Sequence, residues 1–479
     1  MQVPWNRRCA RLALQWVAML GAGAAHAQGN IVPIEVRQMR IGQLNQPLVD
    51  VTVCNAAQQC RIVPNVLLDT GSSGLHLARD TLAGLQLDPV LDLEGRPLAQ
   101  AAYFGSGGLW GTLHSAQVRL GDVTTTQAIP IQLYDAPRLF ERLPAEYRKH
   151  DARKRFLKMA NGILGVSPWR YSPGDYFALR ASDDIDLDSD WVSVQIDTTR
   201  QMANPIAHFP APYNNGSVIQ LPQVDWFNGQ EQVQGRLGLG IGPSTEALFP
   251  PGARRISHEL DPYSEFPAQL GGRSIRVLVD SGNTALSFDL EPHGIPSPAP
   301  DDPYFDPPAL TPLALTVISE GKEIALSRPL YIGPSDHVLK TWSHGYAVLP
   351  MLVTKPKSKY GTQVLGLPFF YGRTVATGLH GTVNPLRGAA QAAPDNQGSL
   401  SLDDDGASLG DAQMHSLTLD SDDGPVAAES AVQSLVAVGE GTGGHAAPEL
   451  ASESAELAVQ DAAFGGPAPS PYGFVVYTD

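Results

Sequence analysis

The stretch NVLLDTGSSGLHL, residues 65–77, decides the fold because it has a close counterpart in RVLVDSGNTALSF, residues 276–288. In each, an apolar run leads into Asp, a hydroxyl residue and Gly, and a second apolar run follows. A single Asp-initiated turn is common, but Asp69-Thr70-Gly71 and Asp280-Ser281-Gly282 are the two such triplets in the chain and have matching contexts. Gly permits a tight turn, and hydroxyl groups can hydrogen-bond a carboxylate or an opposing loop. The pattern predicts two equivalent carboxylates, each at the tip of a turn that leaves a buried strand.

Short apolar runs separated by turn residues continue through most of the 479-residue chain, which contains 47 Gly and 40 Pro. Such spacing predicts an all-β barrel or sandwich rather than long helices. The formal net charge is −16. Nucleic-acid binding needs clustered Lys and Arg on one face, so we expect no nucleic-acid partner.

The N-terminus has the order of a signal peptide. A basic start with Arg7, Arg8 and Arg11 precedes an apolar run at 12–25. Ala25-His26-Ala27 then supplies small residues at the two positions that a signal peptidase requires. The alternative, a membrane anchor, is disfavoured because the run is too short to span about 30 Å of hydrocarbon. We predict cleavage after Ala27, export to the periplasm or the extracellular space, and no stable membrane span.

Removal of the predicted signal peptide leaves two cysteines, Cys54 and Cys60, which lie in VTVCNAAQQCRIV, residues 51–63. The alternating β-branched flanks predict a hairpin. A close pair in an oxidising compartment usually forms a disulfide, and a free buried pair is the alternative. With no nearby His, a metal site is not expected, and no cofactor is expected either.

Three further segments depart from the β pattern. Residues 138–158 are basic and helix-prone, which favours a solvated surface helix over a partner-binding patch. Residues 183–190 alternate carboxylates but lack the Gly of a calcium loop, so we interpret them as a solvated acidic loop. Residues 388–479 are rich in Ala, Gly, Ser, Asp and Glu, and we expect a disordered, acidic, dispensable tail. Its more apolar end, PYGFVVYTD at 471–479, could dock on the fold.

At this point the sequence resembles the pepsin-like aspartic peptidases. Each lobe of that family has an apolar-apolar-Gly segment beside its Asp loop, and Ile163-Leu164-Gly165 and Val364-Leu365-Gly366 match it. The segment at 102–121 resembles the flap, the hairpin that closes over substrate, with Tyr103, Phe104 and Gly105 near its tip. The segment at 235–242 resembles the strand that opens the second lobe.

The resemblance is closer still to a family of secreted bacterial proteins of unknown function. That family has a Cys hairpin before Asp-Thr-Gly-Ser-Ser-Gly-Leu, and segments like those at 204–222 and 365–375. The expected organisation is a signal peptide at 1–27, an N-terminal β lobe at 28–225, a C-terminal β lobe at 226–387 and the tail at 388–479. The fold class is thus all-β, a two-lobed pepsin-like fold with a central cleft, and a monomer is expected.

The resemblance implies that Asp69 and Asp280 share a proton and activate a water molecule, which attacks the carbonyl of a peptide or protein substrate held in the inter-lobe cleft. In this scheme Thr70 and Ser281 brace the loops, Gly71 and Gly282 form their turns, and Ser72 orients Asp69.

The chain departs from the family at Asn283, where Ser or Thr is usual, and at Phe104, where the flap usually has Tyr. There is also no room for a basic prosegment between the signal and the fold. Two hypotheses follow. The first is an aspartic endopeptidase, which the presence of both Asp residues favours. The second is an inactive pepsin-like binding protein, which the flap change and the missing prosegment favour.

Overall fold

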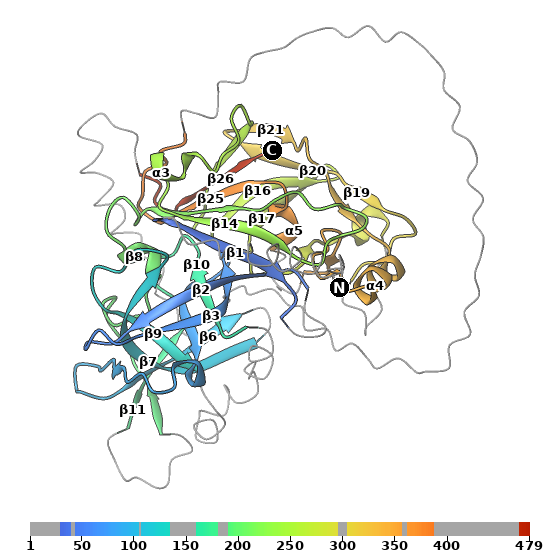
Figure 1. Ribbon diagram of the computed structural model, residues 1–479. Helices are drawn as coiled ribbons and strands as arrows, with labels where there is room; N and C mark the ends of the chain where they lie inside the picture. The colour runs from blue at the N-terminus through green and yellow to red at the C-terminus, as the bar shows by residue number, and fades with distance from the viewer. Residues whose placement is uncertain are drawn as a thin grey trace, which may run out of the picture.

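The computed structural model describes residues 29–39, 44–104, 107–134, 160–180, 190–295, 304–356, 362–387 and 469–479. Within these ranges the fold is all-β with few helices, as predicted (Figure 1). The predicted signal peptide, the segment at 138–158, the acidic loop up to residue 189 and residues 388–468 of the tail lie outside the described residues. No described helix is long and apolar enough to cross a membrane.

The N-terminal half contains a closed ring of strands. The ring runs β2–β3–β10–β4–β9–β7, and β7 pairs again with β2 to close it. The first residues of β7 also pair with β6. Strand β6 in turn pairs with β11, and β11 pairs with β12. The elements of this half are β2 (Gln46–Cys54), β3 (Cys60–Asp69), β4 (Ser73–Ala78), η1 (Arg79–Leu82), β5 (Asp88–Pro89), β6 (Leu98–Phe104), β7 (Gly107–Leu120), β8 (Val123–Thr124), β9 (Ile129–Tyr134), β10 (Gly162–Val166), β11 (Asp175–Leu179), β12 (Trp191–Ser193) and η3 (Pro205–His208).

A six-stranded antiparallel ribbon joins the two halves, in the order β1–β14–β13–β25–β26–β15. Figure 1 shows β1, β14, β25 and β26 between the blue-to-cyan strands and the yellow strands. Because its members come from both ends and the middle of the chain, this sheet fixes the halves against each other. Its elements are β1 (Ile31–Arg37), β13 (Gly216–Gln220), β14 (Val233–Leu239), α3 (Pro243–Glu246), β15 (Arg255–Glu259), β25 (Thr374–Gly378) and β26 (Phe474–Thr478).

The C-terminal half is a seven-stranded sheet in the order β21–β20–β16–β17–β24–β18–β23, with a separate β19–β22 pair. Most neighbours are antiparallel, but β17–β24 and β18–β23 are parallel. Its elements are β16 (Glu265–Leu270), β17 (Arg273–Val279), β18 (Leu286–Ser287), η4 (Glu291–His293), β19 (Thr311–Leu313), β20 (Leu315–Ser319), β21 (Lys322–Ala325), β22 (Leu330–Ile332), α4 (Ser335–Ser343), β23 (Val353–Thr354), β24 (Gln363–Leu365) and α5 (Leu367–Phe370).

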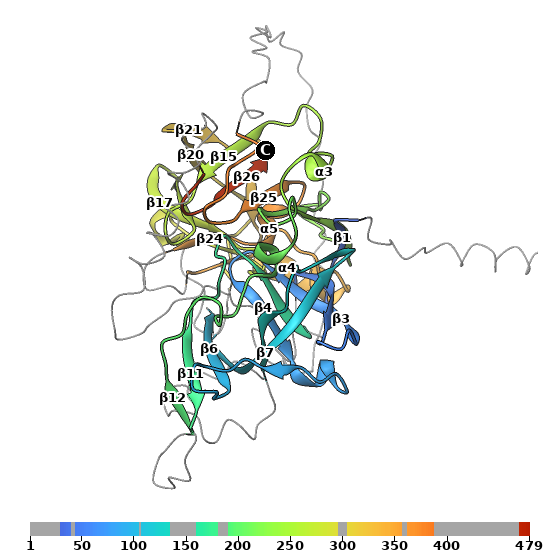
Figure 2. The same ribbon diagram turned by 90° about the vertical axis from the view of Figure 1, so that its left-hand side faces the viewer.

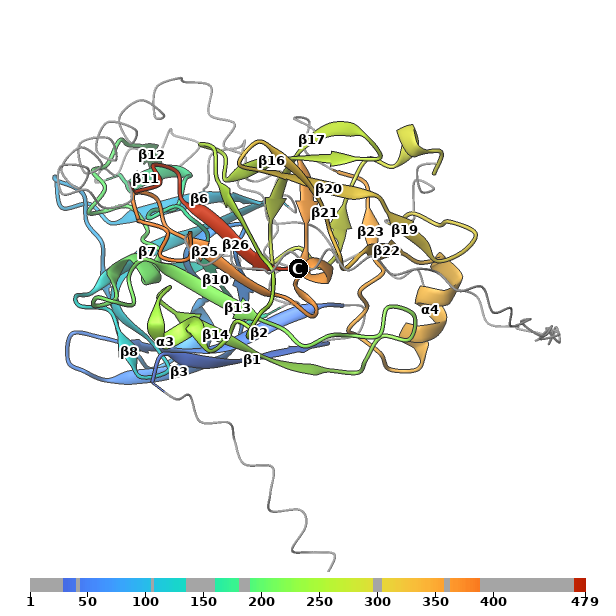
Figure 3. The ribbon, with the colours of Figure 1, turned by 90° about the horizontal axis from the view of Figure 1, so that it is seen from above.

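The expectation of a dispensable tail is wrong for the end of the chain. Strand β26 pairs with β15 on one side and β25 on the other, and Figure 3 shows it in red beside the orange β25. Phe474 and Tyr477 are fully buried. The Asp479 carboxylate accepts a 2.7 Å hydrogen bond from the Ser327 backbone N–H. The five residues of β26 form a strand because β15 and β25 provide a pairing partner on each side. The average composition of residues 388–479 does not reveal this short apolar strand.

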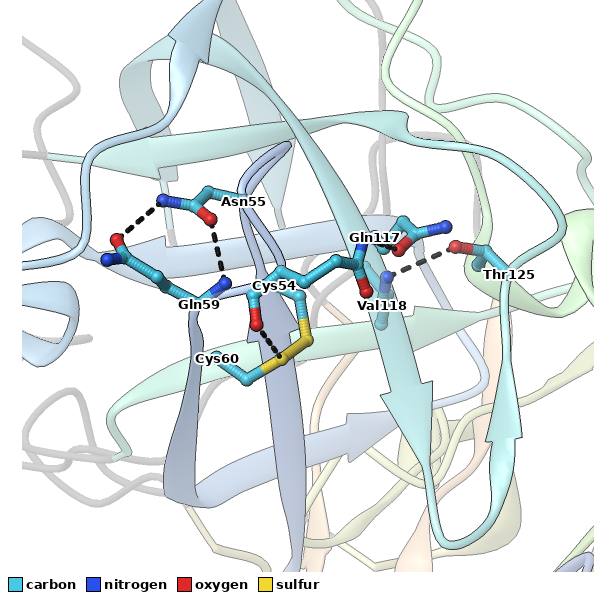
Figure 4. Close-up of a disulfide and its surroundings, with 8 residues drawn as sticks. Cys54, Asn55, Gln59, Cys60, Gln117, Val118 and Thr125 are labelled. Atoms are coloured by element: carbon cyan, nitrogen blue, oxygen red, sulfur yellow. Dashed lines mark hydrogen bonds between the residues drawn. A yellow bond between two sulfur atoms is a disulfide. The ribbon is translucent and has the colours of Figure 1, made fainter.

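The predicted disulfide between Cys54 and Cys60 is confirmed (Figure 4). It lies across the β2–β3 hairpin, where Cys54 and Cys60 are register partners. The turn is held by Asn55, whose side-chain oxygen accepts a 2.9 Å hydrogen bond from the Gln59 N–H. The neighbouring strand β7 contributes Gln117, whose side-chain oxygen accepts a 2.9 Å hydrogen bond from Gln58. The disulfide therefore links β2 and β3 covalently at the turn end of their hairpin.

Candidate active site

Each of the two Asp residues stands where two parallel strands end together. In the N-terminal half β10 runs parallel to β3, and Gly165 is the register partner of Asp69. In the C-terminal half β24 runs parallel to β17, with Leu365 opposite Val279, the residue before Asp280. Both later strands also pair with the strand that leaves the Asp loop, β4 or β18. The two apolar-apolar-Gly segments thus thread the two Asp loops in the same way.

Glycine closes both threaded segments because no side chain would fit there. A Cβ on Gly165 would lie 2.6 Å from the Ser72 carbonyl oxygen, and one on Gly366 would lie 1.9 Å from that of Ala285. Real Cβ atoms do not approach this closely, so each Gly lets a strand pass directly against the backbone of its Asp loop.

Thr70 and Ser281 tie the two loops together by a reciprocal set of hydrogen bonds. The Thr70 N–H donates to Ser281 Oγ at 3.1 Å, and the Ser281 N–H donates to Thr70 Oγ1 at 2.9 Å. Each hydroxyl in turn donates to the opposite strand: Thr70 to the Val279 carbonyl at 3.0 Å, and Ser281 to the Leu68 carbonyl at 2.8 Å. Four buried hydrogen bonds therefore fix the relative position of the two Asp residues.

Asp69 and Asp280 meet across this junction. A Cβ on Gly71 would lie 2.5 Å from Asp280 Cγ, and one on Gly282 would lie 2.6 Å from Asp69 Cγ. Each carboxyl group therefore rests against the glycine of the opposite loop, where only a missing side chain leaves room. The two carboxyl groups are fully buried and hydrogen-bonded to each other.

Burial and proximity change the proton affinity of both groups. Desolvation raises the pKa of Asp69, while hydrogen bonds from Ser72 and the Gly71 N–H act against this. Desolvation raises the pKa of Asp280 well above 3.8, and the charge of Asp69 raises it further. Two adjacent buried carboxylates cannot both ionise readily, so the proximity of the two groups favours a state in which one of them is protonated.

The residues three positions after each Asp differ in their contacts. The Ser72 hydroxyl donates to Asp69 Oδ2. Asn283 donates its backbone N–H to Asp280 Oδ1 at 3.1 Å, but its side-chain nitrogen, although buried, has no hydrogen-bond partner among the described residues. The loops are thus near copies in backbone geometry and unlike in side-chain hydrogen bonding.

The hairpin predicted to be the flap is formed by strands β6 and β7, and it presents Tyr103 and Phe104 to opposite faces. Tyr103 donates a 3.0 Å hydrogen bond to Asp175 of β11 and packs beside Trp110. Phe104 is buried in a cluster with Leu67 of β3 and Ile163 of β10. Gly105 lies outside the described residues. Figure 2 shows β6, β11 and β12 close together, in the pairing order β6–β11–β12. The β6 edge of this hairpin is therefore paired with β11, which in turn pairs with β12.

Sequence reasoning missed a buried polar chain behind the first Asp loop. His76 Nδ1 lies 2.6 Å from the Gln132 side-chain oxygen, and Gln132 Nε2 donates to the Gln100 carbonyl at 2.8 Å. The imidazole also meets the Phe104 ring edge-on, with centroids 5.4 Å apart. Burial lowers the pKa of His76 to about 4, so the ring is neutral at pH 7. Its place seven residues after Asp69 was the only signal in the sequence.

Asn45 was missed as well, because a single Asn before a strand attracts no notice. Its side-chain nitrogen donates to the carbonyls of Thr284 and Leu349, both at 2.7 Å. Its side-chain oxygen accepts from the Leu349 N–H at 2.7 Å and from the Tyr371 hydroxyl at 2.8 Å. Asn45 thus attaches the N-terminal half to the residue that follows Asn283 in the second Asp loop.

The described part of the chain contains no group of three or more His, Cys, Asp or Glu that could hold a metal ion. Asp69 accepts hydrogen bonds from the Ser72 hydroxyl and the Gly71 N–H, and Asp280 accepts them from the N–H groups of Gly282 and Asn283. Such an arrangement can polarise a water molecule and exchange a proton with it.

No curated protein matches the chain. Among solved structures, the chain is similar to the aspartic proteinase from Irpex lacteus, with 16% identity and a TM-score of 0.43, over 72% of this chain and 93% of that chain. A family model matches residues 26–393, most of the chain, and the chain therefore belongs to the family described as "Protein of unknown function (DUF3443)".

Proposed function

We propose that the protein is an exported aspartic endopeptidase that hydrolyses peptide bonds with Asp69 and Asp280. The observation that carries the proposal is the pair of fully buried, mutually hydrogen-bonded carboxyl groups at the junction of two interlocked loops. A structural ion pair would place a cation beside a buried carboxylate. Here each carboxyl group is hydrogen-bonded to the other carboxyl group, an arrangement that stores a proton.

The chemistry follows from the unequal proton affinities. Asp69, with the Ser72 hydroxyl and the Gly71 N–H as donors, is the carboxyl that ionises first. It accepts a proton from a water molecule as that water attacks the peptide carbonyl. Asp280, protonated, donates a hydrogen bond to the oxyanion that develops. The proton that Asp69 has gained then passes to the leaving amine, and the pair returns to its singly protonated state.

Rigidity is part of the proposed mechanism. A general acid and base must be held within hydrogen-bond reach of the reacting atoms. The four hydrogen bonds of Thr70 and Ser281 hold both loops, and the threaded strands β10 and β24 support them from behind. We expect the substrate to be a peptide or protein bound between the halves, and a disulfide-bonded hairpin suits an exported protein.

The second candidate, an inactive peptide-binding protein, is favoured by Phe104. Its ring cannot donate a hydrogen bond, and it is buried among Leu67 and Ile163. Such a flap would still cover an extended peptide by apolar contact.

Incubation with a diverse peptide library separates the two candidates. The protein beginning at Gln28 is incubated with the library at several acidic pH values, with and without a statine-containing inhibitor, and the products are identified by mass spectrometry. An endopeptidase cleaves internal bonds, and the inhibitor abolishes the cleavage. Binding of the inhibitor without any cleavage would favour the binding protein. Cleavage that the inhibitor does not affect would reject the proposed dyad.

A further inference from the structure

Strand β26 lies inside the six-stranded sheet and is buried on both faces. It pairs with β15 on one side and with β25 on the other, so its backbone hydrogen bonds go to strands that precede residue 388. Phe474 and Val476 pack in one hydrophobic cluster, and Val475 and Tyr477 pack in another. Because successive side chains of a strand point to opposite faces, β26 presents an apolar pair to each side of the sheet.

Polar contacts fix the register of the strand at its last residues. The Thr374 N–H of β25 donates to Thr478 Oγ1 at 2.9 Å, and the Asp479 N–H donates to the Arg254 carbonyl at 3.0 Å. Asp479 Oδ1 lies 3.7 Å from Arg373 Nη2, and both side chains are fully buried. Burial lowers the pKa of Arg373 to about 10, so its guanidinium is still charged at pH 7. An apolar strand followed by a carboxylate is therefore the chemistry that this place in the sheet selects.

The chain leaves β25 and returns to β26 at adjacent points. The Ser470 N–H donates to the Thr382 carbonyl and the Gly381 N–H donates to the Ser470 carbonyl, both at 2.9 Å, which makes an isolated bridge just before β26. These hydrogen bonds join residues 470–479 to residues 254–382 of the described fold. The strand is thus held at both of its ends by noncovalent contacts.

We propose that the space between β15 and β25 is a strand-binding site, and that its occupant, residues 469–479 of the same molecule, stays bound after the connection through residues 388–468 is cut. The protein can therefore exist as two chains in one folded molecule. A covalent connection raises the effective concentration of the strand. The contacts of β26 supply its affinity and its sequence preference.

The first test cuts the folded protein. A recognition sequence for a specific protease is placed between Gly465 and Gly466 of the protein that begins at Gln28, and a denaturing gel confirms that every molecule is cut. The short and long chains should elute together from gel filtration, and the circular dichroism spectrum should be that of the uncut protein.

The second test measures the sequence preference of the site by exchange. The cut protein is mixed with a labelled peptide of residues 466–479 at the lowest denaturant concentration that permits exchange, and unlabelled peptides compete with it. Phe474→Ala should compete at least about 100-fold less well, because it leaves a cavity in place of a buried ring. Asp479→Asn should compete about 10- to 100-fold less well, because it removes the carboxylate beside Arg373.

The matched control is Pro471→Ala, at an exposed position of the same segment, which should compete within about 2-fold of the parent peptide. All substitutions are carried by the peptide, so none of them can prevent the protein from folding.

Loss of the short chain from a protein that keeps its spectrum would overturn the inference, as would unfolding as soon as the connection is cut. Equal competition by the three variant peptides would also overturn it, because binding would not depend on the contacts of β26. A protein with the mass of two chains before the cut and of one after it would show that the strand comes from a second copy, which contradicts the assignment to the same molecule. These outcomes need no peptide hydrolysis, so they are separate from the proposed function.

Discussion

Deletion of residues 469–479 should unfold the protein, although it removes only the last eleven residues. The deletion takes away β26, whose four apolar residues, Phe474, Val475, Val476 and Tyr477, are each at most 2% exposed. Full burial of a large apolar side chain contributes about 1.5–3 kcal/mol, so the four together contribute about 6–12 kcal/mol. That range is comparable to the whole stability of a typical domain, about 5–15 kcal/mol.

A finer perturbation is Phe474→Ala, which keeps the strand. Its ring fills the space left by Gly378 of β25, where a Cβ would lie 2.2 Å from the ring. Removing a buried Phe costs about 3–5 kcal/mol. Gly378→Ala forces the same contact from the other strand and should destabilise the protein without any change at the chain end.

The assay is chemical denaturation followed by circular dichroism, which gives the free energy of unfolding. The control replaces residues 390–465 by a shorter Gly/Ser linker and keeps β26, and its unfolding midpoint should stay at that of the parent. An unchanged unfolding midpoint in the 469–479 deletion would refute the reasoning, because it would show that β26 does not stabilise the six-stranded sheet.

Three other predictions concern export, the hairpin and the carboxyl pair. N-terminal sequencing of exported protein should begin at Gln28, and mature protein that retains Met1 would contradict the predicted signal. Replacing Cys54 and Cys60 by Ser should lower the free energy of unfolding by about 2 kcal/mol, the low end for disulfides because the closed loop is short; no change in denaturation would contradict this. Asp280→Asn should be stabilising relative to the parent by an amount that grows as pH rises above 3.8. Burial raises the folded-state pKa of Asp280 above its unfolded value of 3.8. The stability that its protonated form contributes is therefore fully present below pH 3.8 and is lost as the pH rises through the folded-state pKa. An Asp280→Asn gain that is equal at pH 4 and pH 7 would contradict it.

The sequence allowed prediction of the features whose signal is contiguous. Each Asp loop is a continuous stretch in which the carboxylate, its turn glycine and its bracing hydroxyl follow one another. The threaded segments end in a glycine that sterics require. The disulfide joins Cys54 and Cys60, which are six positions apart in one hairpin, so the local sequence was enough to predict the pair.

Other parts depend on partners that sequence order does not reveal. His76, Gln132 and Gln100 come from three strands and form a chain only after β4, β9 and β6 are assembled. Strand β26 lies at the end of an acidic segment that has no Lys or Arg, and its pairing partners β15 and β25 are far away in sequence. Neither its surroundings in the sequence nor any adjacent strand therefore indicated it. The pairing of β6 with β11 likewise depends on the sheet already formed.

The measurement that tests the central claim most directly is the rate of peptide hydrolysis by Asp69→Asn and Asp280→Asn compared with the parent. Asn keeps the size of the side chain and can keep the turn, but it cannot cycle between acid and base. With folding verified by an unchanged circular dichroism spectrum, kcat/KM should fall at least about 10²-fold in each variant, the usual loss for an acid–base group. Hydrolysis that survives both substitutions would contradict the account.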